Sequence, residues 1–219
     1  MACQICEKRK PRRYCPGIGG EICAPCCGNE REQTIDCPLD CEYLQDARRH
    51  ERLPEVNPDE FPNADLQVTD SLIRANEHLL LYLSGALLQA ALETPAVTDA
   101  DLKECLDALV RTYRALESGI YYEIRPENAL ASAVYQRVRA AAQHYQTAIA
   151  QQRGVSAVRD ADVLGVLVFL QRLEIQRNNG RRRGRAFIDF LRSYFAEFQA
   201  ARPAGPPAGA PSGGANLIL

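Results

Sequence analysis

Residues 3–41 read CQICEKRKPRRYCPGIGGEICAPCCGNEREQTIDCPLDC, and this stretch decides how the chain is organised. It holds eight of the nine cysteines in a chain of 219 residues. Crowding of this kind has two common physical causes, a disulfide framework or thiolate ligation of metal ions. The eight cysteines are Cys3, Cys6, Cys15, Cys23, Cys26, Cys27, Cys37 and Cys41.

Two observations favour metal ions over disulfides. No apolar segment typical of a secretory signal occurs in residues 1–10, so we expect a cytoplasmic, reducing location in which disulfides are rare. Two residues separate Cys3 from Cys6 and also Cys23 from Cys26, a spacing at which two thiolates converge on one ion at about 2.3 Å. A disulfide framework and free thiols are the alternatives.

Eight thiols are the number that two complete four-cysteine zinc sites require. A module of about 50 residues with few large apolar side chains cannot be stabilised by apolar burial alone. A structural zinc ion contributes on the order of 10 kcal/mol of folding free energy. The order of the pairs predicts two interleaved sites, a first cysteine group of Cys3, Cys6, Cys23 and Cys26 and a second cysteine group of Cys15, Cys27, Cys37 and Cys41.

The spacing of the last two cysteines predicts a helix. Cys37 and Cys41 are four residues apart, and Pro38 suits the first turn of a helix. Both thiolates would then share one helical face. His50 is a substitute ligand if Cys27 is not used.

Residues 3–50 resemble the cross-brace zinc fingers of the HIT, MYND and B-box families. These families open with Cys-x2-Cys, continue with an aromatic–Cys step (here Tyr14-Cys15) and place a second Cys-x2-Cys before a short helix (here Cys23 to Cys26). The resemblance implies a two-zinc module that binds proteins. It covers this segment alone.

An iron–sulfur redox centre is an alternative, because four thiolates also suit a cluster, although these spacings match neither common ferredoxin pattern. A second alternative is nucleic-acid binding through two basic loops, residues 8–13 and 181–185. Residues 1–60 carry 9 basic and 12 acidic side chains, a net charge of −3. Two zinc ions with eight thiolates add −4 and bring the total to about −7, which disfavours nucleic acid as the partner.

The remaining sequence predicts a mainly α protein in which the cysteine-rich module, residues 1–52, precedes an α-helical bundle. Three prolines within residues 53–65 indicate an extended linker. Apolar periodicity predicts about five helices over residues 66–202, the first from about Thr69 to Thr94 and the fourth, Val163 to Ile175, apolar nearly all round and hence central. Residues 203–219, rich in Ala, Gly and Pro, read as a flexible tail.

Nothing in the sequence predicts catalysis or a membrane span. The three histidines are scattered, and Cys105 has no neighbouring His to activate it, so it reads as a buried small side chain. The longest apolar runs, Leu79–Leu83 and Val166–Leu170, are too short to cross a bilayer. We therefore expect a non-enzymatic, zinc-binding adaptor with a protein partner.

Overall fold

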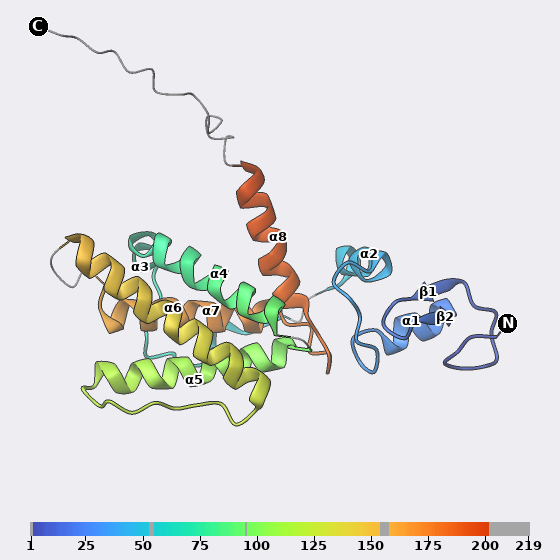
Figure 1. Cartoon of the computed structure of the whole chain (residues 1–219), viewed down its shortest axis with the longest axis horizontal. Coiled ribbons are helices and arrows are strands. Elements are labelled where there is room, and N and C mark those ends of the chain that lie inside the picture. Colours follow the sequence, from blue (N-terminus) through green and yellow to red (C-terminus); the bar gives the residue numbers. More distant parts are fainter. Residues whose placement is uncertain (1, 53–54, 95, 154–157, 202–219) are drawn as a thin grey trace, which may run out of the picture.

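The computed structural model describes residues 2–52, 55–94, 96–153 and 158–201, so the expected tail, 203–219, lies outside the described residues. The chain is mainly helical, at 61%, and its described part has a single two-stranded sheet, which confirms the predicted fold class. The cysteine-rich segment lies beside one end of the helical bundle (Figure 1). Helix α2 (Glu42–His50) lies between the rest of this segment and the start of α8 (Ala186–Ala201) (Figure 1). The rest of the segment consists of β1 (Arg13–Cys15), β2 (Gly20–Ile22) and α1 (Ala24–Glu30).

The cysteine-rich module is built from a hairpin and two short helices. Strands β1 (Arg13–Cys15) and β2 (Gly20–Ile22) pair antiparallel, with Tyr14 opposite Glu21. Gly19 closes the connecting turn at φ +66°, a left-handed conformation that glycine adopts at little cost. Helices α1 (Ala24–Glu30) and α2 (Glu42–His50) follow.

The segment between the module and the bundle packs on helix α7 (Asp160–Arg177). A short 3₁₀ turn, η1 (Pro58–Glu60), interrupts its extended backbone. Asn63 donates a hydrogen bond of 2.7 Å to Gln171, and Arg172 donates one of 2.8 Å to the carbonyl oxygen of Asn63. The connection is therefore held against the bundle along part of its length.

The bundle contains the five expected helical segments with one change. The predicted first helix is divided at Asn76 into α3 (Asp70–Ala75) and α4 (Glu77–Glu93), because the backbone of Asn76 (φ −114°, ψ 23°) leaves the helical region. The next three helices are α5 (Asp99–Glu117), α6 (Ala129–Arg153) and α7, and α8 (Ala186–Ala201) is the last.

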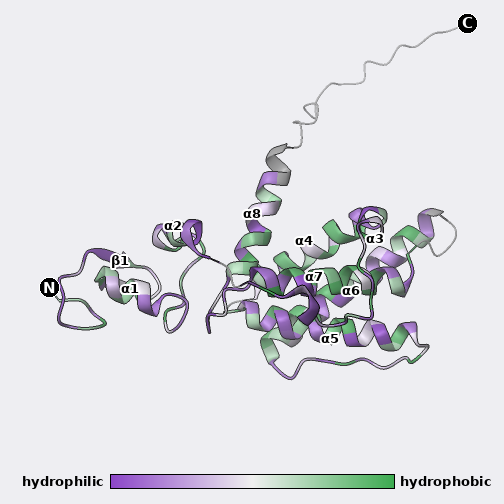
Figure 2. Ribbon diagram, turned by 180° about the vertical axis from the view of Figure 1, so that it is seen from behind, coloured by the Kyte–Doolittle hydropathy of each residue, from purple (hydrophilic) through white to green (hydrophobic). Residues whose placement is uncertain are grey.

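Helix α7 is the central helix of the bundle, as its sequence predicts. It packs against α3, α4, α5 and α8, and the run Val163–Val168 is buried on every side. At Gly165, a Cβ atom would stand 3.0 Å from a methyl group of Leu72, so glycine permits the close approach of α3. Figure 2 shows hydrophobic residues along the bundle helices and a largely hydrophilic module, in keeping with a module that has little apolar core.

Candidate metal centre

The four sulfur atoms of the first cysteine group lie within 4.8 Å of one another. Within the described residues, this is the one group of three or more metal-ligand side chains that meets this distance. The Sγ atoms of Cys6 and Cys23 are 3.9 Å apart. A tetrahedral site with metal–sulfur bonds of about 2.3 Å has an edge of about 3.8 Å, so this group has the dimensions of a four-thiolate metal site.

Local backbone geometry explains why these four sulfurs meet. The backbone N–H of Glu7 donates to the carbonyl oxygen of Cys3 at 2.8 Å, and Glu7 takes a left-handed φ of 54°, which closes the first turn tightly. Cys23 precedes α1 and Cys26 lies in its first turn, with Pro25 between them. The backbone N–H of Cys23 donates to Sγ of Cys3 at 3.2 Å and joins the two halves of the site.

Hydrogen bonds to sulfur favour the thiolate form of Cys3 and Cys6. Burial alone raises the pKa of Cys3, but donors from the backbone of Cys6, Cys23 and Ile5 outweigh burial and lower that pKa to about 6. Backbone donors at Lys8 and Arg9 lower the pKa of Cys6. The thiolate is the form of cysteine that ligates metal ions.

The site is largely buried. Cys3 and Cys23 are fully buried and Cys26 is 8% exposed, whereas Cys6 is partly exposed. A metal ion held by four protein ligands without a position for water is structural, whereas a catalytic zinc ion needs an open position. The four thiols of the first cysteine group can therefore hold one metal ion.

The second cysteine group lines one small cavity of about 10 Å³, roughly the space of a water-sized sphere. Cys15 ends β1, Cys27 follows Cys26 in α1, and Cys41 directly precedes α2. Successive residues of a helix point about 100° apart, which is why Cys26 and Cys27 serve different groups. Not all four of these sulfurs lie as close together as those of the first cysteine group.

The prediction that Cys37 and Cys41 share a helical face is wrong. Residues 37–41 form a turn in which the backbone N–H of Cys41 donates to the carbonyl oxygen of Pro38 at 3.0 Å, and helix α2 begins at Glu42. Pro38 is therefore the first residue of a turn and does not start a helix. Cys41 precedes α2 in extended backbone conformation, in the same way that Cys23 precedes α1.

Two arginines approach the sulfur of Cys27. Arg13 and Arg31 place guanidinium nitrogens 3.6 and 4.0 Å from this sulfur. Burial raises the pKa of Cys37 to about 11, and the negative charges of Glu32, Cys15 and Cys41 add to it, against a backbone hydrogen bond from Glu32. Burial and neighbouring negative charge thus oppose ionisation of the Cys37 thiol.

His50 lies at the end of α2, is exposed and does not line the cavity of the second cysteine group. The basic loop at residues 181–185 contacts the module. Arg181 donates to the carbonyl oxygen of Arg31 at 2.7 Å, and the backbone N–H of Arg183 donates to the carbonyl oxygen of Glu32 at 2.8 Å. Much of this loop is therefore engaged within the chain.

A buried ionic cluster, which no motif in the sequence indicated, joins the module to the bundle. We call Glu32, Arg48 and Asp189 the docking hub. Arg48 pairs with Glu32 at 2.6 Å and with Asp189 at 2.7 Å, and Glu32 is 1% exposed. Glu32 also accepts hydrogen bonds from Asn179 (3.0 Å) and from the backbone N–H of Arg185 (2.9 Å).

Together these features define a protein with a largely buried four-cysteine cluster, able to hold a metal ion, docked on an α-helical bundle. Comparison of the chain with protein-family models, with curated proteins and with solved structures gave no match. Within the described residues, no helix is both long and apolar enough to cross a membrane.

Proposed function

We propose that the module binds two structural zinc ions and acts as the interaction domain of a non-enzymatic adaptor protein. The observation that carries this proposal is the largely buried cluster of the first cysteine group, whose sulfurs have tetrahedral spacing. Such a site supplies folding free energy to a small module and offers no open position to a substrate.

The second zinc ion belongs to the second cysteine group. Its four thiols line one small cavity, and a divalent cation would offset the negative charge of their thiolates. The order of the cysteines is interleaved, since Cys15 of the second group lies in the sequence between the two Cys-x2-Cys pairs of the first group. This order supports the cross-brace type of zinc finger. Reduced cysteines are required at both sites, in keeping with a cytoplasmic location.

The role as an adaptor is supported by the way the module is held. The docking hub fixes α2 and the segment after α1 against the bundle, while the hairpin and the loop 8–13 remain on the outside. A rigid surface that is already ordered loses little conformational entropy when a protein partner binds.

Elemental analysis of the full-length chain, purified without added metal, tests the proposal. We expect two zinc ions per chain and a colourless solution. Cys3→Ser should remove one ion and Cys15→Ser the other, whereas Cys105→Ser, which changes the buried bundle cysteine, should keep both.

Iron with inorganic sulfide and visible absorption would overturn the proposal in favour of a redox centre. A single zinc ion that survives Cys15→Ser and is lost in Cys3→Ser would disprove the second site. Tight, salt-sensitive binding of DNA or RNA by the zinc-loaded chain would contradict the assignment of a protein partner.

A further inference from the structure

A surface cleft lies directly outside the second cysteine group. Its volume is about 320 Å³, at the small end of the range for ligand pockets. The cleft is lined by Tyr14, Pro16, Asp40, Cys41, Glu42 and Tyr43. Three of these residues, Tyr14, Cys41 and Tyr43, also line the inner cavity, so the cleft and the cavity share one wall, and Cys41 in this wall is one of the four thiols.

Two tyrosines give the cleft aromatic walls. Tyr14 is 61% exposed and stands on the outer side of β1. The ring of Tyr43 already holds a cation inside the chain, because the guanidinium carbon of Arg13 lies 4.4 Å from its centroid. Aromatic faces attract Lys and Arg side chains through the negative charge of their π-systems.

The charges around the cleft favour a cation. Asp40 and Glu42 contribute −2, and a zinc ion with four thiolates contributes a further −2, since four thiolates carry −4 and the ion +2. Arginines offset three of these four charges. Arg13 and Arg31 contact the sulfur of Cys27, and Arg192 pairs with Asp40. Glu42 is exposed and belongs to none of the ion pairs among the described residues, so one negative charge is left to an incoming group.

We propose that this cleft binds a Lys or Arg side chain of a basic segment in a partner protein, between the rings of Tyr14 and Tyr43 and beside the carboxylate of Glu42. The proposal rests on the second zinc ion of the proposed function, which would supply charge and fix Cys41 in the wall. It makes the zinc module the recognition surface, with the bundle as its support.

The test uses the full-length, zinc-loaded chain and a fluorescein-labelled glycine peptide carrying several Lys and Arg residues, read by fluorescence anisotropy. Matched peptides replace each Lys and Arg by Gln or by Glu. We expect binding of the basic peptide alone, with at least about a threefold loss of affinity when salt rises from about 50 to 300 mM.

Two variants probe the cleft without altering a metal ligand or the docking hub. Tyr14→Ala should weaken binding of the basic peptide about two- to fivefold, the range for one exposed cation–π contact. Glu42→Gln should weaken it by a similar factor and reduce its salt dependence.

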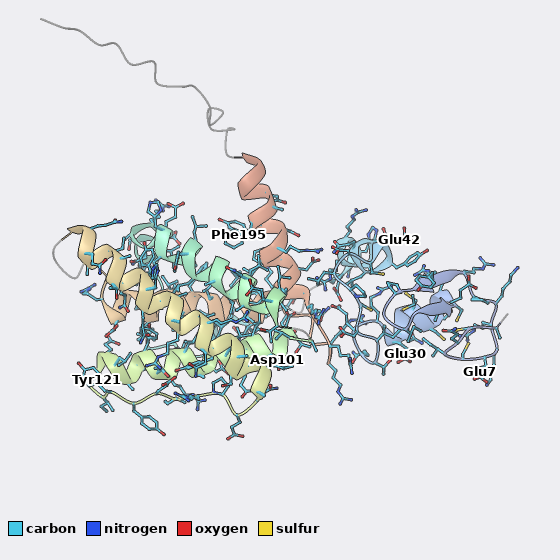
Figure 3. The ribbon with its side chains drawn as sticks, in the orientation of Figure 1. Glu7, Glu30, Glu42, Asp101, Tyr121 and Phe195 are labelled. Atoms are coloured by element: carbon cyan, nitrogen blue, oxygen red, sulfur yellow. The ribbon has the colours of Figure 1, made fainter. Side chains whose placement is uncertain are left out.

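The matched controls lie on the bundle. Figure 3 shows Glu42 on the module and Tyr121 at the opposite end of the bundle. Tyr121, 94% exposed, is the control for aromatic truncation, and exposed Glu117, at the end of α5, is the control for loss of one charge. Tyr121→Ala and Glu117→Gln should leave the affinity unchanged.

Failure of this proposal can be told apart from failure of the proposed function, because zinc is counted in the same samples. Two zinc ions with no binding of the basic peptide, or with equal binding of the Glu or Gln peptide, would overturn the cleft and leave the zinc sites intact. Equal affinity of the wild type and Tyr14→Ala would do the same. A chain without the second ion that still binds the basic peptide with full affinity would refute the electrostatic argument itself.

Discussion

The substitution Glu32→Gln tests whether the docking hub holds the module on the bundle. The carboxylate of Glu32 accepts hydrogen bonds from three donors, on Arg48, Asn179 and the backbone of Arg185, at 2.6 to 3.0 Å. Glutamine has nearly the same shape. It also has the same conformational strain as glutamate in the left-handed backbone conformation at φ 52°. However, its amide nitrogen must face one of these donors and cannot accept from it.

The expected loss follows from burial. The side chain of Glu32 is 1% exposed and that of Arg48 is 12% exposed. Removing one partner of a buried ion pair costs about 3 to 5 kcal/mol. A glutamine carbonyl in the place of Oε1 keeps the contacts with Arg48 and the backbone of Arg185, and Asp189 still pairs with Arg48. We therefore take the low end, about 3 kcal/mol, which is a factor of roughly 100 in the docking equilibrium.

Amide hydrogen exchange separates undocking from a local change. The N–H of Arg185 bonds the side chain of Glu32, whereas the N–H of Arg183 bonds its backbone carbonyl oxygen, which the substitution retains. Undocking should accelerate exchange at both amides, by about 100-fold at Arg183. Glu21→Gln, an exposed change on β2, should accelerate neither. A folded Glu32→Gln protein in which the Arg183 amide exchanges at the wild-type rate would refute the reasoning.

Three further predictions concern packing and titration. Gly17→Ala should destabilise the module by about 1 to 3 kcal/mol in thermal unfolding, because its Cβ would stand 2.6 Å from the backbone oxygen of Asp36. The same change should weaken the retention of zinc against a chelator. Gly28→Ala, whose Cβ meets nothing within 4 Å, should do neither. Burial raises the pKa of Glu174 from 4.5 to about 7, so the folded chain keeps a proton that the unfolded chain releases. The free energy of unfolding in urea should therefore fall as the pH rises from 4.5 to 7. Glu174→Gln should flatten this pH dependence, and an unchanged slope would contradict the assignment. Burial also raises the pKa of Cys105. In the presence of a chelator, a thiol reagent should therefore modify eight cysteines rapidly and Cys105 only after denaturant is added. Rapid modification of all nine cysteines would be inconsistent with the burial of Cys105.

The sequence was sufficient where the physical signal is local and periodic. Two Cys-x2-Cys spacings predicted the first cysteine group, and apolar periodicity predicted the bundle with α7 at its centre. Thr98 and Asp101 have the spacing of a helix-capping pair, and the backbone N–H of Thr98 donates to the carboxylate of Asp101 at 2.8 Å. The break between α3 and α4 at Asn76 has no proline or glycine, so the apolar periodicity predicted one continuous helix there.

The docking hub could not be predicted, because its members lie far apart in the chain and each looks like an ordinary solvated charge. Arg48 sits beside Arg49 and His50 in an amphipathic helix, and Asp189 lies within the first turn of another. The contacts of the basic loop with the module could not be predicted for a related reason. Two of its contacts with Glu32 use backbone N–H groups, which every residue except proline provides.

The position of Glu32 in the chain links the docking of the module to the second cysteine group. Glu32 lies between Cys27 and Cys37, so the segment that reaches the bundle begins and ends at cysteines of that group. A metal ion held by both cysteines would close this segment into a loop and lower the conformational entropy that it loses on docking. The first cysteine group would have no such effect, because none of its cysteines lies beyond Glu32. Docking on the bundle should therefore respond to occupancy of the second site far more than to occupancy of the first.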